Sequence, residues 1–218
     1  MEIAIPLFDR FTALDAIGPY QVLSGLPGAN VRFLGPEPGA VRSDNRMLTV
    51  LVDGRWEDAS APDVLVVPGG VGTRALLGDE RLLDWVRAVH EQTRYTTSVC
   101  TGSLVLAAAG LLDGLDATTH WMERDTLGEL GACPVPARVV EQGKIVTAAG
   151  VSAGIDMALR LVELLTNAEI AQAIQLGIEY DPQPPFDAGS PEKAPAETVE
   201  LVRAAIAQSE AEAEAAAG

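Results

Sequence analysis

The sequence predicts an α/β fold in which a parallel sheet is covered by helices. Apolar runs of strand length alternate with longer stretches of helical period, and the apolar run at 63–67 ends in Pro68-Gly69-Gly70. The chain has 218 residues with 48% hydrophobic content, enough to bury one substantial core. We therefore expect one α/β domain over residues 1–191, followed by an acidic segment rich in Ala and Glu at 192–218.

The first third of the chain alternates between the two patterns. A helix is expected at Thr12–Leu26, where apolar residues recur at helical spacing and Pro19 stands where a first turn could begin. Met47–Val52 is expected to form a small hairpin or an edge strand. The buried strands of this part are expected at Ile3–Phe8, Val31–Leu34 and Asp63–Val67.

The same alternation continues through the second part of the chain. Gly143 separates two apolar runs and predicts a hairpin turn, and Thr166 is a candidate N-cap with Glu169 three residues on. Strands are expected at Tyr95–Val99, Ala117–His120, Val139–Val140 and Lys144–Thr147. Helices are expected at Glu80–Thr93, Gly102–Leu112, Ser152–Leu165 and Ala168–Tyr180.

The C-terminal part differs in composition from the rest. Three prolines in Asp181–Phe186 prevent a helix from continuing, so this stretch is expected to be extended. Beyond Pro195 the Ala and Glu content favours a helix, and the acidic run after Ser209 is expected to be a solvated tail.

Composition excludes several function classes. A formal net charge of −16 repels phosphate backbones, so no nucleic-acid partner is expected. The apolar start at 1–8 is too short for a membrane span and lacks a basic leader, so a cytoplasmic protein without a membrane partner is expected. Cys100 and Cys133 make no disulfide framework. The chain contains no CxxC or HExxH pattern, so neither a metal site nor a cofactor is expected.

The most informative motif is Ser98-Val99-Cys100-Thr101-Gly102. It carries a cysteine from an apolar strand through a tight turn into a helix, as in a nucleophile elbow. The free N–H groups at a helix N-terminus favour a thiolate, which is the attacking form of cysteine. Cys100 is thus the candidate nucleophile, although a lone cysteine is more often a buried structural residue.

Six motifs in order along residues 3–191 resemble the DJ-1/PfpI superfamily, and within it the bacterial isocyanide hydratases. The resemblance implies a flavodoxin-like parallel sheet, of the kind also found in class I glutamine amidotransferases, and usually a homodimer. The motifs are Leu14-Asp15-Ala16-Ile17-Gly18-Pro19, Val67-Pro68-Gly69-Gly70, Ser98-Val99-Cys100-Thr101-Gly102, Thr118-Thr119-His120-Trp121, Ser152-Ala153-Gly154-Ile155-Asp156 and Pro184-Pro185-Phe186-Asp187-Ala188-Gly189-Ser190-Pro191.

The resemblance also implies the catalytic residues. Proteases of the superfamily carry a histidine directly after the nucleophile, whereas this chain has Thr101 there, so a Cys-His dyad is not expected. The hydratase pattern pairs Cys100 with Asp15 and with Thr101. Without the resemblance, Asp15 reads equally well as a first-turn carboxylate that stabilises a helix end.

The implied reaction is the addition of water to an isocyanide to give an N-substituted formamide. Cys100 attacks the isocyanide carbon to give a thioimidate, and Asp15 acts first as acid and then as base, which requires a pKa near the working pH. Gly69, Gly70, Val151 and His120 are the expected substrate-binding residues.

Two other functions remain open at this point. Glyoxalase-like conversion of 2-oxoaldehydes uses a similar cysteine, with His120 as a possible proton carrier, but that branch prefers a glutamate where this chain has Asp15. A non-enzymatic redox sensor would use an exposed thiolate that is oxidised to sulfenic or sulfinic acid.

Overall fold

The computed structural model describes residues 1–215. These residues form two compact units, the first over Met1–Ile178 and the second beginning at Glu179. The predicted division of the chain after Pro191 stays a prediction, and the end of the predicted acidic tail, 216–218, lies outside the described residues.

The first unit is built on a seven-stranded sheet with the order β10-β11-β7-β6-β1-β2-β5. All neighbouring pairs are parallel except β10 and β11, which form the antiparallel hairpin expected around Gly143. The predicted parallel sheet is thereby confirmed. The strands are β1 (Glu2–Pro6), β2 (Asn30–Gly35), β5 (Gly54–Arg55), β6 (Val64–Val67), β7 (Tyr95–Val99), β10 (Val139–Gln142) and β11 (Ile145–Ala148).

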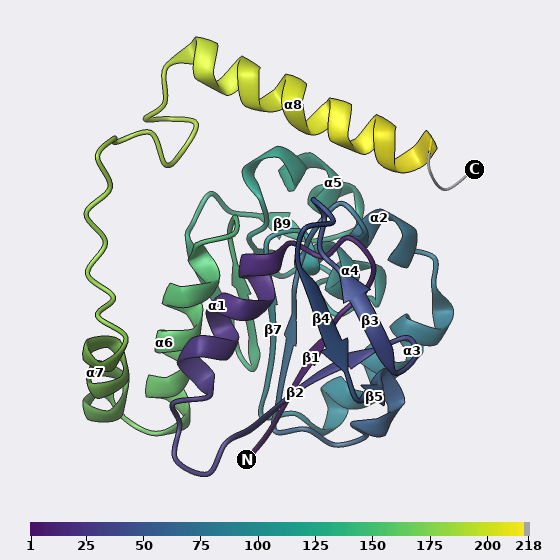
Figure 1. Ribbon diagram of the computed structural model, residues 1–218, viewed down its shortest axis with the longest axis vertical. Helices are drawn as coiled ribbons and strands as arrows, with labels where there is room; N and C mark the ends of the chain where they lie inside the picture. Colours follow the sequence, from purple (N-terminus) through teal and green to yellow (C-terminus); the bar gives the residue numbers. More distant parts are fainter. Residues whose placement is uncertain (216–218) are drawn as a thin grey trace. The chain divides into compact units, whose positions relative to one another are not determined.

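Helices cover both faces of this sheet (Figure 1). On one face α1 (Ala13–Leu23) packs against α6 (Ala153–Leu165), and on the other α3 (Glu80–Gln92) packs against α4 (Gly102–Ala108). β6 is buried along its whole length, as expected for a strand covered on both faces. The remaining helices of this unit are α2 (Thr73–Leu76), α5 (Arg124–Glu129), α7 (Ala168–Gly177) and the 3-10 turns η1 (Trp56–Asp58) and η2 (Trp121–Glu123).

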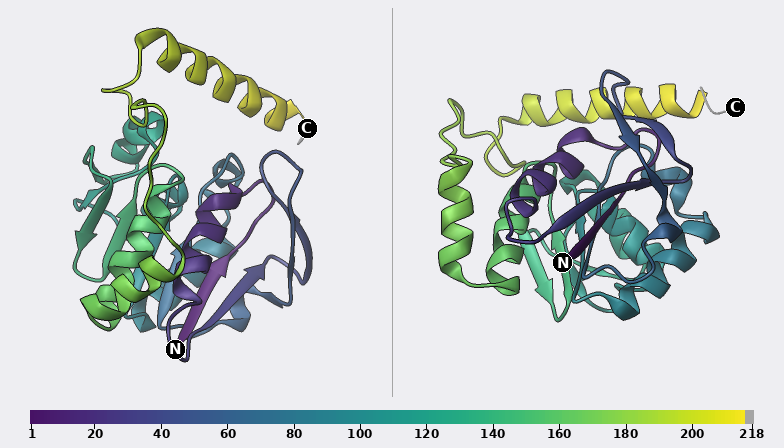
Figure 2. Two further views of the ribbon diagram at one scale, coloured as in Figure 1. Left: turned by 60° about the vertical axis from the view of Figure 1, so that its left-hand side comes forward. Right: turned by 60° about the horizontal axis from the view of Figure 1, so that its bottom comes forward.

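Two small sheets complete the unit. The hairpin of β3 (Gly39–Arg42) and β4 (Thr49–Val52) stands apart from the main sheet (Figure 2), and β8 (Asp116–Ala117) pairs with β9 (Cys133–Pro134). In the second unit, α8 spans Ala196–Ala215. No described helix is long and apolar enough to cross a membrane.

Several local predictions were wrong. The strand predicted at Ala117–His120 is only β8, which ends at Ala117, and the helix predicted at Gly102–Leu112 ends at Ala108. Pro19 lies inside α1 and not at its first turn, so the helical bond from residue 19 to the carbonyl of Asp15 cannot form. The proline ring packs closely on α6, with its Cγ 3.2 Å from where a Cβ on Gly154 would stand. At α7, the N-cap is Asn167, whose side chain accepts from the Ile170 N–H, whereas Thr166 Oγ1 donates to Val162 O and closes α6.

The strand order marks one end of the sheet as the expected position for a ligand. From β1 the chain moves outward to β2, and it then returns to the other side of β1 to lay down β6 and β7. In open parallel sheets, ligands bind at the carboxyl ends of strands where the order reverses in this way. Here that position lies between the ends of β1 and β6, beside the end of β7.

Candidate active site

Cys100 lies directly after β7, in a strained elbow. Its φ is 55°, a conformation that non-glycine residues rarely adopt. The Cys100 N–H donates to the carbonyls of Ala148 and Ala149 at 3.1 and 3.0 Å. Its own carbonyl accepts from the hydroxyls of Ser103 and Thr119 at 3.1 and 3.0 Å. Bonds on both sides of the residue therefore hold the strained conformation in place.

The glycine of the elbow motif is required by packing. A Cβ on Gly102 would lie 2.1 Å from the carbonyl oxygen of Val67 at the end of β6. The first turn of α4 can therefore approach β6 only if residue 102 has no side chain. This close approach brings Cys100 next to the turn that follows β6.

Asp15 reaches the same place from α1. Its side chain is fully buried, and Oδ2 accepts from the Gly69 N–H at 2.9 Å. The other oxygen, Oδ1, is buried without a hydrogen-bond partner of its own, and the Cys100 thiol is the side chain that interacts with this carboxyl group. A carboxylate that served only to stabilise the helix end would not need this burial. The catalytic role of Asp15 stays a prediction.

The Asp15 carboxyl group holds its proton unusually tightly. Its pKa is raised from 3.8 to about 7, and burial is the largest cause. The hydrogen bonds from Gly69 and Cys100 lower the pKa in part, and the nearby charge of Asp44 raises it further. A group with this pKa can both give and accept a proton near neutral pH.

The resting thiolate expected from the helix N-terminus is wrong. Cys100 is only 5% exposed, and burial together with the charge of Asp15 raises the pKa of its thiol well above the usual value. Hydrogen bonds from the backbone N–H groups of Val151 and Thr101 lower the pKa of this thiol, but by less than burial raises it. Cys100 and Asp15 therefore share a buried site in which at least one of them keeps a proton.

Thr101 and the Gly69-Gly70 turn complete this cluster. The Gly70 N–H donates to Thr101 Oγ1 at 2.9 Å, beside the bond from Gly69 to Asp15. The turn is also tied to the chain after β1, because the Thr12 N–H donates to Gly69 O at 2.8 Å. Both glycine N–H groups are thus engaged within the protein, and their contact with substrate stays a prediction.

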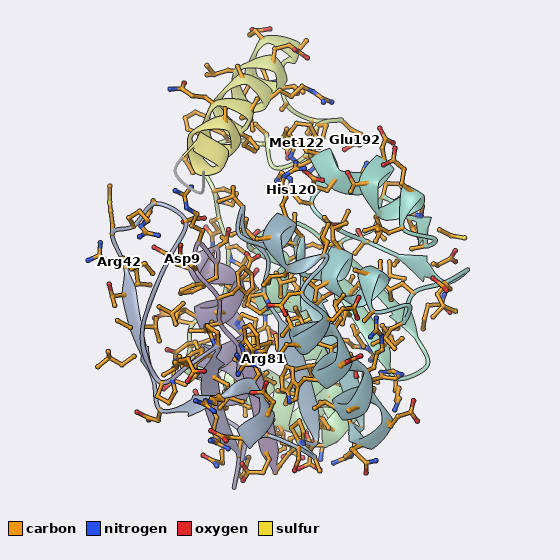
Figure 3. All side chains as sticks on the ribbon, turned by 90° about the vertical axis from the view of Figure 1, so that its right-hand side faces the viewer. Asp9, Arg42, Arg81, His120, Met122 and Glu192 are labelled. Carbon is orange, nitrogen blue, oxygen red and sulfur yellow. The ribbon has the colours of Figure 1, made fainter. Side chains whose placement is uncertain are left out.

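Val151 and His120 are the other two residues expected to bind substrate. Val151 has a φ of 24°, and its N–H acts on the Cys100 sulfur. His120 lies at the end of the domain where the parallel strands finish, far from Arg81 (Figure 3). Its ring packs on Gly150 and on Trp121, and burial lowers its pKa. Among the described residues, no hydrogen bond joins His120 to Cys100 or Asp15.

Sequence reasoning missed Thr73. This residue starts the short helix α2, is 1% exposed, and its hydroxyl contacts Thr101 Oγ1 at 3.1 Å. Nothing in its sequence surroundings distinguishes it from a surface threonine, because α2 is one turn long and has no periodicity to read. Within the described part of the chain, no group of three His, Cys, Asp or Glu residues could hold a metal ion.

Gly69 offers a steric test of this cluster. A Cβ there would lie 2.5 Å from Thr101 N, 2.6 Å from Thr101 Oγ1 and 2.9 Å from Asp15 Oδ2. We expect Gly69→Ala to lower the free energy of unfolding by about 1–3 kcal/mol and to displace Asp15. Urea unfolding measures the first effect, with Gly78→Ala as control because nothing lies within 4 Å of a Cβ at Gly78. Equal unfolding curves for the two variants would contradict the prediction that a Cβ at position 69 clashes with Thr101 and Asp15.

Comparisons with known proteins agree on this architecture. A model of the DJ-1/PfpI family matches residues 1–164. The chain is 46% identical to the isonitrile hydratase of Pseudomonas putida over 209 residues, 96% of this chain and 91% of that protein. Isonitrile is another word for isocyanide. The crystal structure of a ThiJ/PfpI family protein from Pseudomonas syringae superposes with a TM-score of 0.91 at 38% identity, covering 100% of this chain and 90% of that one.

A regulatory protein is also similar over part of its length. The HTH-type transcriptional regulator GbdR of Pseudomonas aeruginosa is 34% identical over 190 residues, which are 83% of this chain but 51% of the regulator. The α/β domain is therefore shared between proteins of different kinds, and the site must be argued from its own residues.

Proposed function

The chain belongs to the DJ-1/PfpI family, and we propose that it hydrates isocyanides to N-substituted formamides, with Cys100 as nucleophile and Asp15 as general acid and base. The observation that carries this proposal is the buried pair itself, in which the Asp15 carboxyl group has a pKa of about 7 and contacts the thiol of Cys100. Similarity to the isonitrile hydratase of Pseudomonas putida supports the choice of substrate class.

The first step forms a thioimidate. The isocyanide carbon is electrophilic, and the Cys100 sulfur adds to it as the thiol gives its proton to the Asp15 carboxylate. Asp15 then delivers this proton to the same carbon. One S–C bond and one C–H bond form, the carbon–nitrogen triple bond becomes a double bond, and Asp15 is left as a carboxylate.

The second step consumes water. The Asp15 carboxylate removes a proton from a water molecule, whose oxygen adds to the thioimidate carbon, and the nitrogen takes that proton from Asp15. The tetrahedral adduct collapses with cleavage of the C–S bond. Its hydroxyl proton returns to sulfur through Asp15, so that the formamide leaves and the thiol is restored. The hydroxyl of Thr101 orients Asp15 or the water.

The N–H groups of Val151 and Thr101 are suited to stabilise the negative charge that develops on sulfur during the reaction. Both act on the Cys100 sulfur and favour its negative form, which develops as the thiol loses its proton and again as the C–S bond breaks. In this proposal, Val151 and His120 line the space for the substituent on nitrogen.

Turnover of para-nitrophenyl isocyanide, followed by its ultraviolet spectrum, tests the proposal. We expect loss of the isocyanide and formation of one equivalent of the N-substituted formamide, identified by mass spectrometry. Absence of turnover by folded, reduced protein would contradict it. Methylglyoxal conversion, assayed on the same preparation, would then identify the glyoxalase-like alternative.

We further propose that the protein is a cytoplasmic homodimer. The described residues expose large apolar side chains on α1 and on the β3–β4 hairpin, and a second copy would cover them. The exposed fractions are 41% for Leu14, 87% for Met47, 40% for Leu48 and 73% for Leu51. Cys100 and Cys133 are both free thiols, as expected in a reducing compartment.

A further inference from the structure

Thr119 is a fully buried residue of the segment that follows β8, and the mechanism above does not use it. Its hydroxyl donates to the Cys100 carbonyl at 3.0 Å. The residue before it is tied to the main sheet, because the Thr118 N–H donates to Thr147 Oγ1 on β11 at 2.9 Å. Since β11 pairs with β7, the Thr119 hydroxyl reaches the Cys100 carbonyl from a support outside α4.

The Cys100 carbonyl is held from two directions. From the first turn of α4, the Ser103 hydroxyl donates to it at 3.1 Å and the Ser103 N–H at 3.4 Å. The donors of Ser103 belong to α4, whereas Thr119 is anchored on the sheet. The φ of 55° at Cys100 is unfavourable for a residue with a side chain and persists only where the surroundings enforce it. The orientation of this peptide group therefore depends on its hydrogen bonds.

The Cys100 carbonyl and the Thr101 N–H are the two ends of one peptide group. A trans peptide group is planar, and its C=O and N–H point in opposite directions, so a bond that holds the oxygen also fixes the direction of the N–H. The Thr101 N–H forms a hydrogen bond with the Cys100 sulfur. We propose that Thr119 is a positioning residue, whose hydroxyl holds the Cys100 carbonyl and thereby orients the Thr101 N–H toward the Cys100 sulfur. This inference rests on the proposed role of Cys100 as nucleophile.

The consequence concerns the negative charge on sulfur. A hydrogen bond from the Thr101 N–H favours the thiolate that forms when the thiol loses its proton. Thr119→Val keeps the shape of the side chain but removes the hydroxyl. The peptide group then rotates toward the donors of Ser103, and its N–H turns away from the sulfur. Asp15, which acts on the same sulfur, is left unchanged by this substitution.

The test is the second-order rate constant for alkylation of Cys100 by iodoacetamide between pH 7 and 9, measured by peptide mass spectrometry on the full chain. The thiolate is the form that reacts. We expect Thr119→Val to lower this rate constant about 3- to 10-fold at each pH, and Thr119→Ser, which keeps the hydroxyl, to restore it. The matched control is Thr118→Val, because Thr118 is equally buried and its hydroxyl donates to a different carbonyl, Ala137 O, at 2.8 Å. This control should react at the wild-type rate.

The sign of the change separates a positioning role from a structural one. Loss of a residue that only stabilised the fold would loosen the elbow and expose the sulfur, which speeds alkylation. An unchanged or higher rate in Thr119→Val, or an equal decrease in Thr118→Val, would overturn the inference. If Thr119→Val does not fold, Thr119→Ala is compared with Thr119→Ser, from which it differs by one oxygen atom. A lower rate in the alanine variant would support the inference, and equal rates would overturn it.

The alkylation assay is independent of the hydration reaction. A wild-type protein that fails to hydrate isocyanides, in a series that shows the expected alkylation rates, would refute the proposed function and leave the orienting role of Thr119 in place. Where turnover is present, kcat should fall about 10-fold in Thr119→Val with KM unchanged, and should recover in Thr119→Ser.

Discussion

Cys100→Ala is expected to lower isocyanide turnover by at least about 10⁴-fold, to below detection. Without the sulfur no thioimidate forms, and there is no thiol from which Asp15 can take a proton. The fold should be retained, because the elbow is held by bonds to the backbone of residue 100, which alanine keeps. Initial rates with para-nitrophenyl isocyanide measure the effect.

Cys133→Ser is the matched control for this substitution. Cys133 is an exposed free thiol on β9, and it is not among the groups that act on Cys100 or Asp15, so the variant should turn over at the wild-type rate. Intact mass spectrometry should find an adduct trapped by acid quench in Cys133→Ser and none in Cys100→Ala. Turnover by Cys100→Ala at a tenth of the wild-type rate or more would show that the thioimidate is not an intermediate.

Asp15→Asn is expected to lower turnover by about 10²–10⁴-fold, since an amide cannot move a proton in either step. The same substitution should also change how stability depends on pH. The pKa of Asp15 is raised from 3.8 to about 7, so the folded state binds the proton more tightly than the unfolded state. The free energy of unfolding therefore decreases as pH rises through this interval, and asparagine removes that decrease.

The expected size of this decrease in unfolding free energy follows from the shift in the pKa of Asp15. Between pH 5 and pH 8 the wild-type protein should lose about 2–3 kcal/mol of unfolding free energy through Asp15 alone, a loss that Asp15→Asn should not show. Urea unfolding of both proteins at the two pH values measures the difference. Asp63→Asn, which changes a half-buried carboxylate that accepts from the Glu2 N–H, controls for changes in net charge. Equal pH dependence in wild type and Asp15→Asn would mean that Asp15 is ionised at little cost in the folded protein.

Much of the fold could be predicted because its strands are apolar and regularly spaced. The predicted strand Tyr95–Val99 has the same bounds as β7. For the other predicted strands, most ends lie within two residues of the observed ones. The short elements α2 and η2 could not be predicted, since segments of four and three residues show no periodicity. Pro19 was misplaced because a proline is typical of a first helical turn, whereas α1 begins six residues before it.

The sequence led to candidate residues that the structure brings together, but it did not predict their electrostatics. The motif identified Cys100, and the family resemblance added Asp15 and Thr101. The helix N-terminus suggested a thiolate, whereas the tertiary structure buries the sulfur beside a carboxyl group and so favours the thiol. Desolvation depends on everything packed around a group, and no local pattern reports it.

The turn at Gly69-Gly70 matters for any attempt to engineer this protein. It binds Asp15 through one N–H and Thr101 through the next, while its carbonyl accepts from Thr12 on the segment that leads into α1. A longer carboxylate at position 15 would have to enter space that Gly69 and Thr101 already occupy, so converting the reaction requires several coordinated substitutions. Libraries that aim at new substrates should hold residues 69 and 70 constant and vary Val151 and His120, which in the proposed mechanism line the space for the substituent and carry no proton.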